Sequence, residues 1–257
     1  MHFYQNYIAL MTIIRREVAR FSRLWIQTVL PPVITTLLYF VIFGHVIGRY
    51  VADMGGVTYM QYIVPGLIMM AIMNNAYANV VSSFFGAKFQ HYIDEMLVSP
   101  TSSLVILVGY LFGGIARGLA VGIIVAVVAY FFAPIKVYAF GLMILVAVLS
   151  AALFSLGGFI NAIFSRKFDD ITLIPTFVLT PMIYLGGVFY SIHLLPPVWQ
   201  TISLFNPILY MINAFRFTML GVSDIAIAPA LLMLCGFLII FFMFAWYLLA
   251  KGVGLRN

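Results

Sequence analysis

Charged side chains are rare in this chain, and all but one of them lie in a few short clusters separated by long apolar runs. Of the 257 residues, 13 are Lys or Arg and 7 are Asp or Glu, whereas 65% are hydrophobic. Because a charge in hydrocarbon costs several kcal/mol, such runs suit a bilayer and not the surface of a water-soluble protein. The pattern predicts an integral membrane protein with several spans. We attribute the net charge of +6 to membrane orientation and expect no nucleic-acid partner.

A helical span needs about 20 apolar residues, and six segments of the chain meet that length. They predict an all-α fold in which residues 1–257 form a single transmembrane domain. The lone Cys235 falls within the last segment, so no disulfide can form inside the chain. The expected spans are residues 24–46, 59–86, 103–132, 138–164, 171–190 and 225–250.

The basic residues are unequally divided between the two sides of the membrane. With six spans, the N-terminus, the second and fourth loops and the C-terminus share one side. Because basic residues gather on the cytoplasmic side of membrane proteins, nine against three places both termini in the cytoplasm. The nine are Arg15, Arg16, Arg20, Arg23, Lys88, Arg166, Lys167, Lys251 and Arg256, and the three are Arg49, Lys136 and Arg216.

Residues 5–23 predict an amphipathic helix. Apolar side chains recur at steps of three and four from Tyr7 to Trp25, and Arg16 and Arg20 fall on the opposite side. Such a helix lies in the membrane interface, with its basic face toward headgroups or toward a partner. A plain surface anchor and a docking helix both fit the pattern. The candidate interface residues are Arg15, Arg16, Glu17 and Arg20.

The loop of residues 87–102 predicts a short cytosolic helix that ends at Ser99 and Pro100. It mixes acidic and apolar side chains, which suits docking into a groove of another protein. A solvated connector is the alternative, and docking is favoured. The candidate docking residues are Lys88, Phe89, Gln90, His91, Tyr92, Ile93, Asp94, Glu95 and Met96.

Three polar side chains lie deep within the expected spans and are candidates for a transport pathway. Arg117 is about 14 residues from either end of its span, too deep to reach the headgroups easily. Asn75 and Asn79 share one face of the second span. Bonding between helices is the alternative role for all three. The glycines near Arg117, at positions 113, 114, 118 and 122, would let another helix approach closely.

The stretch from Ile171 to Phe215 contains no charge over 45 residues. A single helix of that length would reach roughly 68 Å, over twice the hydrocarbon thickness, and must therefore break. After a span at residues 171–190, we expect residues 191–224 to form a short helical pair that enters from the outer side, returns, and gates the outer mouth. The candidate gate residues are Pro196, Pro197, Asn206, Pro207 and Arg216.

Several motifs of membrane chemistry are absent from the sequence. No Gly-Lys pair occurs, so a Walker A phosphate loop is excluded. The metalloprotease motif HExxH and the hydrolase motif GxSxG do not occur either, and we expect no catalytic residue and no metal site. The expected spans hold no Asp or Glu, which disfavours coupling to protons or sodium. What remains is a pore or transport scaffold powered from elsewhere.

The whole chain resembles the type-2 ABC exporter permeases in its amphipathic N-terminal helix, its six expected spans and its two-part outer element. The resemblance is strongest to the bacterial branch that includes the nodulation-factor, capsule and O-antigen exporters and the YadH-like inner-membrane permeases. In the third span, the residues that carry it are Gly113, Gly114, Arg117 and Gly118. In the run from Pro175 to Gly221, they are Pro181, Gly186, Phe189, Leu195, Pro196, Asn206, Pro207, Tyr210, Arg216 and Gly221.

The resemblance implies a function that the residues alone do not give. Two such subunits would form the pathway, and two separately encoded ATPases, which carry ATP and Mg, would bind beneath them. Residues 87–102 would be the coupling helix, residues 5–23 the interface helix beside the ATPase, and residues 191–224 the gate for release. The chain itself would bind no cofactor.

The resemblance does not name the cargo. We expect an amphiphile exported across the bacterial inner membrane: a glycolipid or oligosaccharide first, a hydrophobic drug second. Other classes of function stay open, namely a membrane scaffold, an enzyme that modifies lipids at the interface, and a passive channel.

Overall fold

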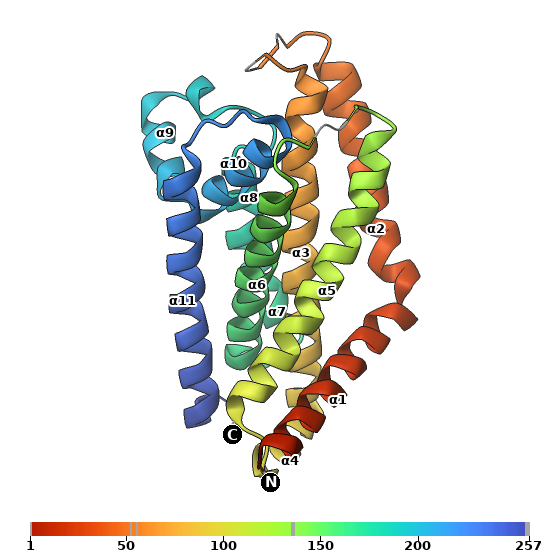
Figure 1. The fold of residues 1–257 in the computed structure, drawn as a ribbon, viewed down its shortest axis with the longest axis vertical. Helices are drawn as coiled ribbons and strands as arrows, with labels where there is room; N and C mark the ends of the chain where they lie inside the picture. Colours follow the sequence, from red (N-terminus) through yellow and green to blue (C-terminus); the bar gives the residue numbers. More distant parts are fainter. Residues whose placement is uncertain (1, 52, 55, 135–136, 255–257) are drawn as a thin grey trace.

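A computed structural model of the chain describes residues 2–51, 53–54, 56–134 and 137–254 (Figure 1). Two residues of the charge count, Lys136 and Arg256, lie outside the described residues. The expected all-α architecture is confirmed: the chain is an elongated bundle of helices. The helices are α1 (His2–Arg23), α2 (Trp25–Tyr39), η1 (Phe40–Ile47), α3 (Tyr59–Phe89), α4 (Tyr92–Val98), α5 (Ser103–Tyr130), α6 (Phe140–Phe164), α7 (Asp170–Ile174), η2 (Pro175–Leu179), α8 (Thr180–Leu185), η3 (Ile192–Leu194), α9 (Pro197–Leu204), α10 (Pro207–Leu220) and α11 (Ile227–Lys251).

Five helices of the described chain are long and apolar enough to cross a membrane: α2 with its π-helical continuation η1, α3, α5, α6 and α11. Each agrees with an expected span to within three residues at either end. Side-chain caps set two of the starts. Thr58 and Gln61 form a capping box before α3, and the hydroxyl of Ser102 accepts the Val105 N–H before α5.

The expected span at residues 171–190 is shorter than predicted. The structure has an interrupted apolar helix of 16 residues, α7–η2–α8, which ends at Leu185. Gly187 adopts a left-handed conformation with φ +75° just beyond this end, a backbone state that glycine enters without strain. The apolar residues that follow, Val188 and Phe189, are buried in a loop and do not continue the helix.

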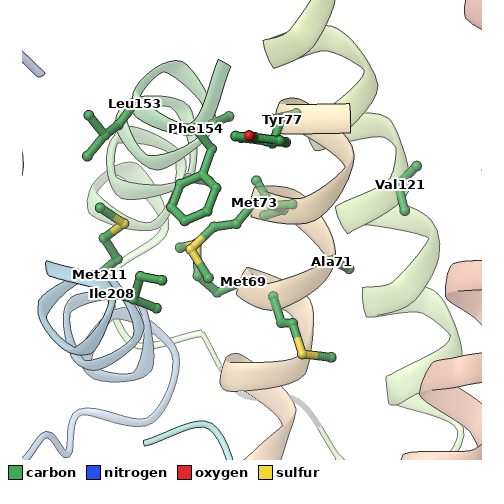
Figure 2. Close-up of a cluster of buried hydrophobic side chains, with 14 of the residues drawn as sticks. Met69, Ala71, Met73, Tyr77, Val121, Leu153, Phe154, Ile208 and Met211 are labelled. Carbon is green, nitrogen blue, oxygen red and sulfur yellow. The ribbon is translucent and has the colours of Figure 1, made fainter. Parts of the chain in front are cut away.

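Helix α3 lies at the centre of the bundle and packs against α5, α6 and α10. Figure 2 shows Met69, Met73 and Tyr77 of α3 close to side chains of α6 and α10. All three are buried. Methionine fills irregular gaps well because its side chain is unbranched and polarisable.

Glycines bring the backbones of the central helices into contact. A Cβ added at Gly118 of α5 would lie 2.9 Å from the carbonyl oxygen of Ile72, on α3. At Gly158 of α6 it would lie 2.6 Å from the carbonyl oxygen of Tyr77. The prediction that these glycines of α5 admit a close neighbour is confirmed. Gly113, on another face of α5, receives Glu17 of α1 instead.

Residues 191–224 contain the short helix η3 and two longer helices, α9 and α10, each of which begins at a proline. Pro197 and Pro207 stand at their first turns, where a missing N–H costs nothing. Asn206 makes the break between them: its Oδ1 accepts the Ile208 N–H at 3.0 Å, and its Nδ2 donates to the Met182 carbonyl at 2.6 Å. Figure 1 shows both helices at the end of the bundle opposite α4.

Candidate functional site

A groove of about 300 Å³ lies between α2, α3 and α5. Arg117 and Asn75, two of the three pathway candidates, line it together with Thr28 and Thr36 of α2. Asn75 is tied to its own helix, because its Nδ2 donates to the Ala71 carbonyl at 3.0 Å. The third candidate, Asn79, lies outside the groove. The structure thus brings together two candidates from different spans and separates the third.

Arg117 stands near the middle of α5, roughly 20 Å from either end of the helix. Its side chain is partly buried, and its Nε finds no hydrogen-bond partner in the described part of the chain. The groove has no acidic side chain among the residues that line it. The result is a cation at membrane depth without a counter-charge, where an unpaired charge is costly.

Asn79 belongs to a second polar cluster, where α1 crosses α3 and α5. The guanidinium of Arg20 donates to the backbone oxygen and to Oδ1 of Asn79, both at 2.9 Å. Arg16 donates to the Tyr110 hydroxyl at 2.7 Å. We expected the basic face of α1 to point toward headgroups or a partner. Arg16 and Arg20 also bond within the chain, while Arg16 keeps 45% of its side chain exposed, so the direction of the basic face stays a prediction. Arg15 is exposed, as expected.

Glu17 is the buried acid beside which Arg16 and Arg20 lie. Its side chain is fully buried against Gly113, it accepts a hydrogen bond from the Ser83 hydroxyl at 2.6 Å, and it lies 3.3 Å from Arg20 and 3.6 Å from Arg16. A buried carboxylate needs cations and donors around it. The sequence placed Glu17 on a surface helix, and no local signal indicates its burial.

Glu17→Gln is expected to weaken the attachment of α1. The substitution removes the charge that holds Arg16 and Arg20, and we expect it to lower the unfolding free energy by about 1–3 kcal/mol. The partial exposure of both arginines keeps this loss below that of a fully buried ion pair. Unfolding of the purified protein in detergent measures the change. Arg15→Gln, an exposed change on the same helix, is the control. Equal stability of the two variants would contradict the anchoring role.

The α4 tip, defined as α4 with the end of α3 and residues 165–169, exposes a mixed apolar and acidic surface. Phe89, Tyr92 and Val98 are exposed at 57%, 52% and 89%, beside the exposed Asp94 and Glu95. The other docking candidates among residues 88–96 are divided. Gln90 and His91 are exposed, whereas Met96 is half-buried and Ile93 is buried.

Residues 165–169 are fixed to the end of α3. Lys88 donates from Nζ to the carbonyls of Ile163 at 2.5 Å and Ser165 at 2.9 Å, so this docking candidate holds the end of α6. The ring of Phe168 packs on Phe89 with 4.9 Å between centroids. The start of α1 reaches the same end, where Asn6 accepts the Ser102 N–H at 3.2 Å. Figure 1 shows the start of α1 beside α4.

The end of the bundle at α10 contains a polar network around Arg216. We expected Arg216 in the helical pair that gates the outer mouth; it lies in α10 and is fully buried. Its guanidinium donates to the Gly187 carbonyl at 2.5 Å and to Asn213 at 3.3 Å, and it stacks 3.9 Å from the ring centre of Tyr62. These contacts replace water around the cation, and this is why it tolerates burial.

Asp224 closes this network, and the sequence did not single it out. Its carboxylate accepts from the Ser191 hydroxyl at 2.8 Å, the Ile192 N–H at 3.0 Å and the Tyr62 hydroxyl at 3.3 Å. Of the other gate candidates, Pro196 and Pro197 are exposed at the start of α9, whereas Asn206 is buried at the α9–α10 break. The five gate candidates therefore do not form one site.

A second cavity, of about 330 Å³, is almost wholly apolar. It lies between α3, α6, η2, α10 and α11, and Figure 2 shows Leu153, Phe154, Ile208 and Met211 around it. Without a charge, it offers no recognition of a polar headgroup. The groove at Arg117 is therefore the better candidate for selecting a ligand.

Comparison with known proteins matches residues 8–220 to the family described as ABC-2 type transporter. The inner membrane transport permease YadH of Escherichia coli (strain K12) is 53% identical over 257 residues, the full length of both chains. Nodulation protein J of Rhizobium leguminosarum bv. viciae is 25% identical over 242 residues, covering 92% of each chain. The matched region contains the groove, α4 and Arg216.

Proposed function

Because the chain belongs to the ABC-2 type transporter family, we propose that it is the membrane-spanning subunit of an ATP-driven exporter. The family expected from the sequence is confirmed, and the chain is a multi-pass transport permease of the inner membrane. Such a permease is the membrane subunit and not an enzyme, and the family works with an ABC ATPase. The energy for export therefore comes from a partner that binds ATP and Mg.

The groove between α2, α3 and α5 is the observation that carries the export proposal. A charged and amide-lined hollow at membrane depth is expensive to maintain against lipid, and such groups commonly mark a substrate path. In the described chain this groove holds a deep cation that is not paired with an acid. A passive scaffold has no use for that arrangement.

We propose that two copies of the chain face each other and that the pathway lies between them. Most side chains of α2 are exposed, and the groove opens at this side of the bundle. A second copy would cover the polar wall that lipid cannot solvate. The pathway would then be lined twice by the same residues, as a two-fold interface requires.

We further propose six crossings with both termini in the cytoplasm. The interrupted helix α7–η2–α8 would be the fifth, since its 16 residues extend about 24 Å and the buried loop after it adds depth. Helices α9 and α10 would then enter from the outer side, return, and gate release. The basic residues support this orientation.

The α4 tip, which we place in the cytosol, is the proposed docking surface for the ATPase, so that two copies of the chain would bind two ATPase copies. It brings the exposed Asp94 and Glu95 together with Phe89, Tyr92 and Val98 at one end of the bundle. Apolar side chains beside charges are the composition of a helix that fits a partner's groove. The start of α1 lies beside this surface and would act as the interface helix.

A pull-down tests the exporter proposal directly. The tagged chain is solubilised in detergent, its bound proteins are identified, and ATPase activity is measured. We expect a stoichiometric nucleotide-binding subunit and ATP hydrolysis. A clean protein without a partner and without ATPase activity would contradict the proposal and favour a channel, a scaffold or an interfacial enzyme.

Charge reversal tests the docking surface. The double variant Asp94→Lys, Glu95→Lys is expected to lower the co-purified ATPase at least about tenfold, equal to about 1.4 kcal/mol of binding free energy. Asp53→Lys is the control, since Asp53 is an exposed acid that lines a hollow with Ser191 and Asp224, away from the tip. Both proteins should show the melting temperature of the wild type. Full ATPase recovery with the double variant would rule out this surface.

A further inference from the structure

The groove between α2, α3 and α5 has the chemistry of an anion site. The only cation among its lining residues is Arg117, and its other polar side chains are neutral amides and hydroxyls, among them Gln27, Thr28, Thr36, Asn74 and Asn75. Asn74 is exposed to the groove, and its amide is free to turn toward a ligand. An arginine offers five donors in a planar fork, which matches a phosphate or carboxylate.

No acid of the described chain is available to neutralise Arg117. Among the described residues, Glu17 is the one buried acid, and it already contacts Ser83, Arg16 and Arg20. Because Glu17 already lies beside two cations, the positive charge in the groove stays uncompensated until an anion arrives.

The groove is also placed for a ligand that comes from the membrane. Outside the groove, Ile26, Leu30, Ile34 and Leu38 of α2 form an exposed apolar stripe at four-residue steps. The same helix supplies Thr28 and Thr36 to the groove. A molecule with its polar end at Arg117 could lay a hydrocarbon tail along this stripe without leaving the bilayer.

We propose that the groove binds the anionic headgroup of a membrane amphiphile, with Arg117 as the cation and the amides of α2 and α3 as hydrogen-bond partners. The ligand class is a phosphate- or carboxylate-bearing lipid or lipid-linked molecule. This inference rests on the proposed function, because it names the chemistry of the cargo that the permease would move.

The test uses short-chain phosphatidic acid as the probe and isothermal calorimetry of the purified chain in a neutral detergent. Diacylglycerol with the same tails tests the tail alone, and inorganic phosphate tests the free anion. The wild type should bind phosphatidic acid at least about tenfold more tightly than either, as expected for one charge-assisted hydrogen-bond pair at depth. Equal binding of diacylglycerol or of inorganic phosphate would overturn the proposal.

Variants locate the site. Arg117→Gln should weaken phosphatidic acid binding at least about tenfold, and Arg117→Lys, which keeps the charge without the fork, should restore only part of it. Lys251→Gln, an exposed cation at the end of α11, should leave it unchanged and so controls for loose adsorption. Asn74→Leu, at an exposed position that tolerates substitution, should weaken binding even if Arg117→Gln does not fold. Wild-type affinity in both Arg117→Gln and Asn74→Leu would sink the proposal.

The two proposals fail separately. ATPase recovery with the wild-type chain reports on the exporter function and does not depend on Arg117. If the ATPase co-purifies but phosphatidic acid binding is the same with and without Arg117, the headgroup inference alone is wrong. If phosphatidic acid binds at Arg117 but no ATPase is recovered, the exporter function is wrong.

Discussion

Gly158→Ala is expected to destabilise the protein, although alanine favours helix more than glycine does. The new methyl carbon would sit 2.6 Å from the Tyr77 carbonyl oxygen and 3.3 Å from its carbonyl carbon, so helix α6 must move away from α3. Overpacking of this kind costs about 1–3 kcal/mol, and here the obstructing atoms are backbone and cannot change rotamer. Unfolding in detergent micelles, followed by circular dichroism, measures the loss.

The neighbouring glycine supplies the matched control. At Gly157 the same methyl carbon would lie 3.6 Å and 3.7 Å from ring atoms of Tyr77, which is ordinary contact. Gly157→Ala should therefore be neutral, or more stable by up to about 1 kcal/mol from helix propensity. If the two variants were equally stable, the backbone contact between α3 and α6 would not be as close as the structure has it.

Arg216→Ala is the second change with a large expected effect. It leaves the Gly187 carbonyl without its donor, removes one of the two donors to the Asn213 amide oxygen, and opens a cavity beside Tyr62. The unpaired buried carbonyl and the cavity add up to a loss of about 3–5 kcal/mol in unfolding free energy. Chemical unfolding in detergent gives the value, with Arg166→Ala at an exposed position as the control.

A conservative change separates charge from geometry at the same position. Arg216→Lys keeps the cation but cannot reach Gly187 and Asn213 together, because lysine has a single nitrogen at its tip. We expect its unfolding free energy to lie between those of the wild type and Arg216→Ala. A fully stable Arg216→Ala would mean that the network around Tyr62 and Asp224 does not hold α10 against α3.

The apolar pattern predicted most of the fold because bilayer thickness fixes span length. Five expected spans agree with helices of the structure, and the break at Asn206 follows from a proline that begins the next helix. The end of the segment at residues 171–190 was missed. Its composition stays apolar through Tyr190, while the true end depends on the left-handed Gly187, which hydrophobicity does not register.

The buried charges were the hardest part to predict. Glu17 and Arg216 lie near segment ends, where a charged residue ordinarily faces water, and their partners come from distant parts of the chain. Ser83 is 66 residues from Glu17, and Gly187 is 29 residues from Arg216. Arg117 could be singled out because its position in the middle of a span leaves no route to water. Its lack of an acidic partner was visible in the sequence, but the groove around it was not.

The glycine contacts indicate which helices would move together if α4 were displaced. Helix α4 joins α3 directly to α5, and Gly118 and Gly158 hold the backbones of α5 and α6 against α3. A displacement of α4 would therefore move α3, α5 and α6 together. Helix α2 forms the third wall of the groove and is not part of this group of helices, since most of its side chains are exposed. A displacement of α2 relative to α3 and α5 would therefore widen or narrow the groove.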